Sequence, residues 1–275
     1  KNRYFDNGVL DFLIEERKAG RIRNLGFSFH GDIKVFDYML SLHETIHWDF
    51  VQIQMNYIDW RHAEDLKEGN VNAETLYGKL EALGIPVIIM EPLLGGQLAT
   101  LNENLNKQLQ SRRPQQSIAS WAFRFAGTKP GVLTVLSGMT YMEHLQDNLR
   151  SYAPFKPLTD EEVSLLEKIG HEFAMFPTVP CTACAYCMPC PYGIDIPEVF
   201  RHFNNCLNEG LMQDDETASD YKKLRKKYLS SYLEKVSRDR QADHCIGCGK
   251  CIGGQAAGLT GGYGSSYSQA AGQQQ

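Results

Sequence analysis

The sequence predicts an α/β fold with a parallel sheet, followed by a smaller and mostly helical segment that is rich in cysteine. Between residues 5 and 155, helix-like segments alternate with short apolar segments that are typical of strands. Such alternation requires parallel strands joined by right-handed crossovers. Beyond this region, seven of the eight cysteines fall in two tight groups, at 181–190 and at 245–251.

Helices are predicted where apolar residues recur every three or four positions, and strands where short apolar runs occur. The first helix is expected to end at Gly20, because glycine is a common helix stop. In the second strand, Val51 and Ile53 alternate with Gln52 and Gln54, so the two kinds of residue lie on opposite faces. In chain order the expected elements are a helix over 6–20, a strand over 23–29, a helix over 33–44, a strand over 49–57, a helix over 72–84, a strand over 85–93, a helix over 115–128, a strand over 131–138 and a helix over 142–152.

The strand over 85–93 is a nearly continuous apolar run, which is typical of a strand that is covered on both faces. Four strand–helix units fit two architectures. One is a doubly wound open sheet. The other is half of an eight-unit β/α barrel, since a whole barrel takes roughly 250 residues.

The composition changes after Tyr152. Thr159 is placed as a helix cap ahead of Glu162, which predicts a helix that runs to about Phe176. The tail is rich in Gly, Ser, Ala and Gln, and it is expected to be disordered because it lacks the apolar residues of a core. The predicted domains are 1–155 for the β/α units, 156–176 for a linker helix, 177–252 for the cysteine segment with polar helices, and 253–275 for the tail.

Charge and hydropathy exclude several classes of protein. The sequence has 28 basic and 33 acidic residues and a net charge of −5, so it lacks the overall positive charge that attracts nucleic acid or an anionic membrane. It has no apolar run of about 18 residues, so no membrane-spanning helix is expected. An export signal is also missing from its start, which favours a cytoplasmic protein.

The cysteine groups predict iron–sulfur clusters. The first group reads C-x2-C-x2-C-x2-C-P and the second reads C-x2-C-x2-C. Cysteines at this spacing wrap three thiolates around three corners of a [4Fe–4S] cube, and in two-cluster ferredoxins the cysteine before proline serves the other cluster. We therefore expect Cys190 to complete one cluster with the second group. The members of the two groups are Cys181, Cys184, Cys187 and Cys190, then Cys245, Cys248 and Cys251.

The other three cysteines of the first group could hold a second cluster, but this prediction stays undecided because no fourth cysteine follows Cys251. The first group also has two residues before its last cysteine, where the bacterial ferredoxin run has three. The alternative to iron is a zinc site of four thiolates, which gives no reason for a third cysteine in each group. Cys206 stands alone at helical spacing from Phe203 and is expected to be a buried small apolar residue.

Ligands of parallel α/β folds bind at the carboxyl ends of the strands. Gly138 is expected to open the last helix, whose amides are suited to a phosphate. The polar residues and glycines at the predicted strand ends are Ser28 and His30, then Gln52, Gln54 and Asn56, then Glu91, Gly95 and Gly96, then Ser137 and Gly138.

Four strings in this order resemble the second half of an aldo-keto reductase: GRIRNLGFSFH, DFVQIQMNYID, GIPVIIMEPLLGGQLA and VLSGMTYMEHLQDNL. The cysteine strings CTACAYCMPCPYGIDIP and ADHCIGCGKC resemble the ferredoxin-type extension of a bacterial subfamily of these enzymes. The resemblance covers residues 5–252. It implies the C-terminal half of a (β/α)8 TIM barrel, followed by a small, mostly α-helical ferredoxin-like domain.

The resemblance also implies a cofactor, NADP(H) or NAD(H), that exchanges hydride with a carbonyl or alcohol. Ser28 and Gln52 match the positions that hold the nicotinamide amide, and Asp147 and Asn148 match the pair that contacts adenine. The positions that match the pyrophosphate loop are Glu91, Pro92, Leu93 and Gly95, and those that match the adenosine phosphate and ribose segment are Ser137, Gly138, Met139 and Thr140.

In the family, the catalytic Asp, Tyr, Lys and His come from the first four units, so no residue here matches a catalytic position. The sequence is therefore expected to be a fragment of a longer enzyme. A half barrel also leaves two strand edges unpaired, which native proteins avoid.

The favoured function is an oxidoreductase in which nicotinamide chemistry is coupled to electron transfer through one or two [4Fe–4S] clusters, with a ferredoxin or flavoprotein as redox partner. One alternative is a non-enzymatic electron carrier. Another is a zinc-stabilised binding module that uses the basic run KKLRKK, although a solvated helix face explains that run as well.

Overall fold

The computed structural model describes residues 5–66, 69–175, 178, 179, 181, 183, 185, 187–212 and 215–251. They form two compact units. The first holds residues 5–64, 69–92 and 122–167, and the second holds 65, 66, 93–121 and the described residues from 168 onward. The tail 253–275 and Cys184 lie outside the described residues, and the domain boundaries proposed from the sequence stay predictions.

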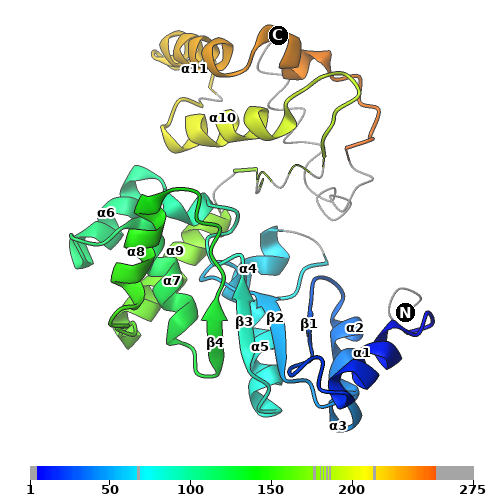
Figure 1. The fold of residues 1–275 in the computed structure, drawn as a ribbon. Coiled ribbons are helices and arrows are strands. Elements are labelled where there is room, and N and C mark those ends of the chain that lie inside the picture. Colours follow the sequence, from blue (N-terminus) through cyan, green and yellow to red (C-terminus); the bar gives the residue numbers. More distant parts are fainter. Residues whose placement is uncertain are drawn as a thin grey trace. The chain divides into compact units, whose positions relative to one another are not determined.

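A four-stranded parallel sheet forms the centre of the first unit (Figure 1). Its strands follow chain order, β1–β2–β3–β4, with no reversal. A doubly wound sheet reverses its strand order at a switch point, so the observed order favours consecutive units of a β/α barrel. All four predicted strands form, each shorter than its apolar run: β1 (Gly26–Ser28), β2 (Phe50–Gln54), β3 (Val87–Met90) and β4 (Val132–Val135).

The predicted helices form as well, and glycines end two of them. Gly20 follows α1 with φ 73° and Gly84 follows α5 with φ 66°, a conformation that glycine adopts without strain. The helix predicted over 33–44 is divided into α2 and α3. The helices up to the cysteine segment are α1 (Val9–Lys18), α2 (Ile33–Ser41), α3 (His43–Ile46), α4 (Asp59–Leu66), α5 (Ala73–Ala82), α6 (Glu103–Arg112), α7 (Ile118–Thr128), α8 (Met142–Tyr152) and α9 (Asp160–Met175).

The sequence analysis missed α4 and α6. Both are polar helices, and their average hydropathy resembles that of a loop. Asn102 caps α6, since its side chain accepts a hydrogen bond from the backbone N–H of Leu105 at 3.0 Å. This cap was the local sign of a helix in the polar stretch after the third strand.

The core of the first unit follows the alternation along the strands. Val51 and Ile53 of β2 and Ile89 of β3 are fully buried, as predicted, and α5 covers the sheet with Leu80. On the opposite face of β2, Gln52 and Gln54 are only half-buried. The sheet therefore has one apolar face against helices and one face that carries polar groups at its carboxyl end.

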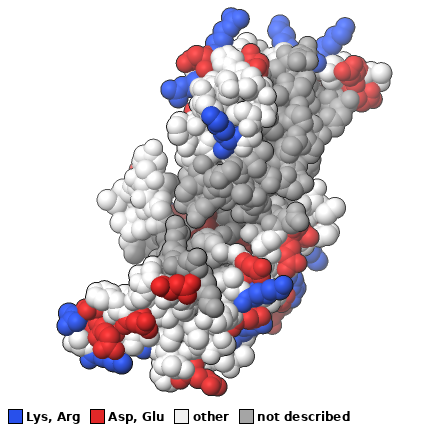
Figure 2. Space-filling model, turned by 90° about the vertical axis from the view of Figure 1, so that its right-hand side faces the viewer, with Lys and Arg blue, Asp and Glu red and all other residues white. Residues whose placement is uncertain are grey.

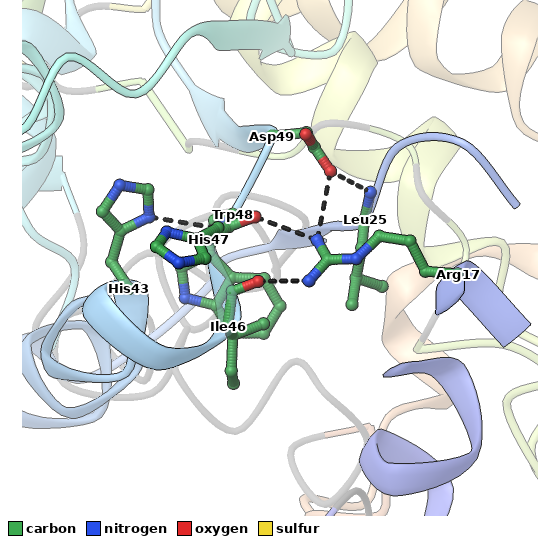
Figure 3. Close-up of polar contacts among 7 residues, drawn as sticks. All are labelled: Arg17, Leu25, His43, Ile46, His47, Trp48 and Asp49. Carbon is green, nitrogen blue, oxygen red and sulfur yellow. Dashed lines mark hydrogen bonds and ion pairs between the residues drawn. The ribbon is translucent and has the colours of Figure 1, made fainter. Parts of the chain in front are cut away.

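Arg17 and Asp49 connect the segments at the amino ends of β1 and β2 (Figure 3). The Arg17 guanidinium donates to the carbonyl oxygens of Ile46 and His47 and forms an ion pair with Asp49 at 3.3 Å. The same Asp49 carboxylate accepts the backbone N–H of Leu25 at 2.7 Å. The three carbonyl and carboxylate acceptors tie α1 to the segments that enter β1 and β2.

The predicted capping box is present at α9. Thr159 N–H donates to the Glu162 carboxylate at 3.0 Å, and Glu162 N–H donates to the Thr159 hydroxyl at 3.3 Å. The cysteine segment contains α10 (Ile196–Asn208) and α11 (Tyr221–Lys235), followed by the short 3-10 helices η2 (Arg238–Arg240) and η3 (Ala242–His244); a third 3-10 turn, η1 (Gln97–Ala99), follows β3. None of the helices in the described ranges combines the length and apolarity that a bilayer crossing requires.

Candidate functional site

The carboxyl ends of β1 and β2 bring together the two residues predicted to hold a nicotinamide amide. Ser28 is the direct neighbour of Gln52 in the register of the two strands. The Gln52 amide donates to the sulfur of Met90 at 3.3 Å, and the Ser28 hydroxyl lies 3.9 Å from the same sulfur. A thioether is a weak acceptor. Both donors are therefore held in place and keep most of their capacity for a stronger acceptor.

Phe29, which follows Ser28, belongs to the core. Its side chain is 6% exposed, and its ring packs against that of Phe36 with centroids 4.6 Å apart. Its backbone N–H donates to the carbonyl of Gln52 at 2.9 Å, so the pairing of β1 and β2 extends one residue past the Ser28–Gln52 pair.

A buried polar cluster lies directly beyond β2. The side chains of Asn56 and Asp59 are 0% and 2% exposed. Asp59 Oδ2 accepts hydrogen bonds from the amides of Gln54 at 2.7 Å and Asn56 at 2.6 Å. Asn56 also donates to the carbonyl of Glu91 at 3.0 Å, and its oxygen accepts the backbone N–H groups of Ile58 and Asp59 at 2.9 Å. This cluster joins the end of β2, the start of α4 and the end of β3.

Burial raises the pKa of Asp59 to about 6. The hydrogen bonds from Gln54 and Asn56 act in the opposite direction, and the negative charge of Glu91 adds a smaller upward contribution. The carboxyl group of Asp59 therefore changes its protonation state close to neutral pH, unlike an ordinary aspartate.

The chain leaves β3 through a turn of unusual backbone conformation. Glu91, which the resemblance assigns to the pyrophosphate loop together with Pro92, has a φ of 53°, which a residue with a side chain adopts at a cost of order 1 kcal/mol. The hydrogen bond from Asn56 to its carbonyl stabilises this conformation.

Leu93 and Gly95, the other two loop positions, belong to the second unit. The carbonyl of Leu93 accepts the N–H groups of Gly96 at 2.9 Å and Leu98 at 3.1 Å. Gly95 and Gly96 have φ values of 63° and 95°, and a side chain at either position is strained. Both glycines line a cavity of about 250 Å³, whose other polar lining residues include Gln97, Asn102, Arg201, Asn204, Asn205 and Asn208.

The predicted ribose and adenine positions lie after β4. Asn148 donates to the hydroxyl of Ser137 at 2.9 Å, so two of them meet. Asp147 forms an ion pair with Arg150 at 3.3 Å, and Thr140 N–H donates to the ring of His144 at 3.3 Å. Met139 is 45% exposed.

The expectation for Gly138 was wrong in one respect. Helix α8 begins at Met142 rather than at Gly138, because residues 137–140 run in an irregular segment before the helix. Gly138 therefore lies four residues before the first helical residue, and its open Cβ direction leaves free space along this segment.

Cys251 of the second group interacts electrostatically with Cys190 of the first. Burial raises the pKa of the Cys251 thiol, and electrostatic interactions with Cys245, Cys248 and Cys190 raise it as well. Cys190 and Cys251 also pack against the same apolar cluster, which includes Ile194, Tyr232 and Val236. The sharing of one cluster by these four cysteines stays a prediction.

The loops that carry these cysteines contain residues with left-handed backbone. Gly247 and Gly249, on either side of Cys248, both have a φ of 69°. In the first group, Ala183 and Ala185 have φ values of 53° and 61°. Such residues turn successive N–H groups toward one centre, as in loops that hold anions and iron–sulfur clusters.

Of the other predicted metal ligands, the two that are described pack against different apolar clusters. Cys187 packs against the apolar cluster of Cys190, whereas Cys181 packs against Val179 and Phe203. Cys184 lies outside the described residues. Among the residues that are described, no three His, Cys, Asp or Glu side chains gather closely enough to hold one metal ion.

Cys206 is a core residue, as predicted. It is 3% exposed, and its sulfur lies 3.4 Å from His202 Nε2, which in turn lies 2.9 Å from the Ser231 hydroxyl. Burial raises the pKa of the Cys206 thiol and lowers that of His202 to about 4. Thiol and imidazole are both neutral at pH 7, so the pair lacks the thiolate of a cysteine nucleophile.

Comparison with known proteins decides the family. The sequence profile described as the Aldo/keto reductase family matches residues 5–171, which is more than half of the chain. The chain belongs to the aldo/keto reductase family. No curated protein is significantly similar to this aldo/keto reductase.

Three solved structures, two of them aldo-keto reductases by name, are similar to part of it, each with a TM-score of 0.46. An aldo-keto reductase from Bacillus halodurans in its holo form is 18% identical over 60% of this chain and 56% of its own. A thermostable aldo-keto reductase, Tm1743, in complex with the inhibitor epalrestat is 20% identical over 58% and 53%. The protein Gox0644 in its apo form is 14% identical over 62% and 56%. The present chain thus spans just over half the length of these structures.

Sequence reasoning missed two residues of the candidate site in this aldo/keto reductase, one at the end of β3 and one at the start of α4. Met90 was read only as part of an apolar strand, and no pattern marks its sulfur as the acceptor for Ser28 and Gln52. Asp59 was missed although a signal existed. It is the single acidic residue of the string MNYIDW, which is otherwise mostly apolar and aromatic. A carboxyl group in such surroundings is buried only where hydrogen-bond donors contact it.

Proposed function

We propose that this protein is a nicotinamide-dependent oxidoreductase that binds the dinucleotide at the carboxyl ends of β1 and β2 and acts on small carbonyl compounds or alcohols. The pairing of Ser28 with Gln52 carries the proposal. A carboxamide presents one acceptor and one donor group, and a hydroxyl beside a side-chain amide complements both. When bound, the dinucleotide supplies or accepts a hydride.

The remaining positions that resemble the family extend this assignment. Glu91, Pro92, Leu93 and Gly95 would lie along the pyrophosphate, and Ser137, Gly138, Met139 and Thr140 along the adenosine phosphate and ribose. Asn148 holds the Ser137 hydroxyl in place at 2.9 Å, and together with Asp147 it would contact adenine. The choice between NADP(H) and NAD(H) stays open, because the segment 137–144 has no Lys or Arg to receive a 2′-phosphate.

Replacing Gln52 with alanine tests this assignment. The variant loses the amide that is only weakly engaged by Met90, so its affinity for the preferred dinucleotide is expected to fall about tenfold, the loss of one good hydrogen bond. Isothermal titration with NADP⁺ and with NAD⁺ measures it.

Gln110→Ala is the matched control, because Gln110 is an exposed residue of α6, and this variant should bind like the parent protein. If the parent protein binds neither dinucleotide, the oxidoreductase assignment is wrong, and the electron-carrier alternative is favoured.

We further propose that Cys190, Cys245, Cys248 and Cys251 hold a [4Fe–4S] cluster. The cysteine spacing, the packing of Cys190 and Cys251 against one apolar cluster, and the left-handed glycines of the second group support it. A zinc ion bound to four thiolates at about 2.3 Å needs every sulfur within about 4 Å of the others. An iron–sulfur cluster binds each cysteine to a separate iron, so its thiolates stand further apart. Among the described residues no three such side chains gather around one metal position, so the choice between iron and zinc rests on the cysteine pattern of the sequence.

Held by these cysteines, a cluster would supply one-electron transfer to a ferredoxin or flavoprotein, so the two electrons of one hydride would require two successive transfers and the release of one proton. The cluster content is measured as iron and acid-labile sulfide per chain, after anaerobic purification and reconstitution. We expect about four irons for one cluster, and about eight if Cys181, Cys184 and Cys187 hold a second one with an outside ligand. Zinc without sulfide would contradict the proposal and favour a zinc-stabilised module. A cytoplasmic location stays a prediction.

The exposed lysines of α11 do not favour the alternative of a nucleic-acid-binding module. Lys222, Lys223, Lys226 and Lys227 lie on the solvent side of the helix, while Tyr228 and Tyr232 are buried. On the face of the molecule in Figure 2, basic and acidic side chains are interspersed. The basic run therefore fits a solvated helix face better than a nucleic-acid site.

A further inference from the structure

The carboxyl group of Asp59 is buried without a cation beside it. Its side chain is 2% exposed, and in the described part of the chain no Lys, Arg or His forms an ion pair with it. Arg61, which lies on the same helix as Asp59, forms ion pairs with Glu74 at 2.8 Å and Glu167 at 2.9 Å instead. Burying an unpaired carboxylate opposes folding. Its presence therefore requires an explanation other than stability.

The contacts of Asp59 lead to the loop that follows β3. One carboxylate oxygen receives the amides of Gln54 and Asn56. The second hydrogen of the Asn56 amide then reaches the carbonyl of Glu91, and the Asn56 oxygen accepts two backbone N–H groups of α4. Every hydrogen-bonding position of the Asn56 amide is thus in use, so its orientation is fixed.

The peptide at Glu91 is in the left-handed conformation, with φ 53°. In the proposed function this turn begins the loop along the pyrophosphate. We propose that Asp59 is a positioning residue for the dinucleotide: as a carboxylate it orients Asn56, which holds the turn at Glu91 in its binding conformation. This inference rests on the proposed nicotinamide binding.

The role has a pH dependence. Burial raises the pKa of Asp59 to about 6. Glu91, at the end of β3, is the charged group that acts on it, and it pushes the pKa in the same direction. Below pH 6 the carboxyl group is protonated, and its hydrogen bonds to the two amides lose their charge assistance and about half their strength. Affinity for the dinucleotide should therefore fall as the pH drops through 6.

The effect on stability has the opposite sign. Because the pKa of Asp59 is raised in the folded protein, the ionised form is the disfavoured one, and folding stability is lost as the pH rises from about 4 to about 6. Asparagine at this position has the same shape and no charge. At pH 7.5, Asp59→Asn should therefore leave the melting temperature unchanged or raise it, whereas a merely structural carboxylate would lower it.

The experiment measures NADP⁺ and NAD⁺ binding by isothermal titration calorimetry between pH 5 and pH 8, together with thermal melting, for the parent protein and Asp59→Asn. Glu64→Gln, an exposed residue of the same helix, is the matched control. For the parent protein we expect affinity to fall about tenfold between pH 7.5 and pH 5. For Asp59→Asn we expect the weaker affinity at every pH and an unchanged or higher melting temperature.

Two results overturn the inference alone: the variant binds the dinucleotide as the parent does, with the same pH profile, or its melting temperature falls by several degrees. If the parent protein binds no dinucleotide at any pH, the proposed function is wrong and this role of Asp59 with it.

Discussion

Replacing Cys251 with serine is expected to abolish the [4Fe–4S] cluster. The variant should lose the visible absorbance of the cluster and about four irons per chain, because serine is a poor ligand for this softer metal centre. Cys251 interacts electrostatically with Cys190, Cys245 and Cys248, and it packs, partly buried, against the apolar cluster of Ile194 and Tyr232. Its loss leaves three thiolates for four irons.

Cys190→Ser is the more informative variant, because it tests the link between the two cysteine groups. If Cys190 completes the cluster of the second group, this variant should lose as much iron as Cys251→Ser. If instead Cys190 serves the first group, the iron bound by the second group should survive in Cys190→Ser.

Cys206→Ser is the matched control for both variants. It makes the same chemical change at a buried cysteine of α10 that contacts His202 and Ser231 rather than the other cysteines. Iron, sulfide and absorbance should match the parent protein. Equal loss of iron in all three variants would contradict the ligand assignment, since it would indicate a folding defect common to every cysteine replacement.

Replacing Gly26 with alanine is expected to destabilise the first unit by about 3 kcal/mol or more. An added Cβ would lie 2.3 Å from the carbonyl oxygen of Phe50 and 2.7 Å from its ring. The oxygen is backbone of the neighbouring strand, so β1 must move away from β2. Overpacking of this kind costs about 1–3 kcal/mol where side chains can shift, and more where they cannot. Denaturant unfolding followed by circular dichroism measures the loss.

Gly78→Ala provides the opposite case in the same unit. Gly78 lies inside α5, is exposed, and has nothing within 4 Å of its Cβ direction. Alanine there should increase the free energy of unfolding by about 0.5–1 kcal/mol.

Gly26→Ala should also weaken dinucleotide binding, because it separates Ser28 from Gln52. A Gly26→Ala protein as stable as the parent would contradict the close strand packing.

The comparison of sequence and structure separates two kinds of information. The local pattern predicted the strands and their order along the chain, the capping box of Thr159 with Glu162, and the glycine that ends α1. Each of these depends on residues close in sequence. Helices α4 and α6 were missed because their composition is mostly polar and each contributes only two or three residues to a buried face, such as Leu105 and Leu109 of α6.

The candidate sites divide in the same way. Cysteine spacing predicts which four thiols belong together, and this assignment stays a prediction, while Cys190 and Cys251 pack against the same apolar cluster. Parallel strands likewise place Ser28 beside Gln52 at their common carboxyl edge.

By itself, the sequence thus determined the alternation of strands and helices, the cysteine pattern and the membership of the aldo/keto reductase family. Only the tertiary structure decided the order of the strands within the sheet, the acceptor role of Met90 and the burial of Asp59. These depend on contacts such as that between Asn56 and Glu91, which are 35 residues apart. A carboxylate that is an ordinary surface charge in the sequence acquires a raised pKa only when folding removes it from water and leaves it with amide partners.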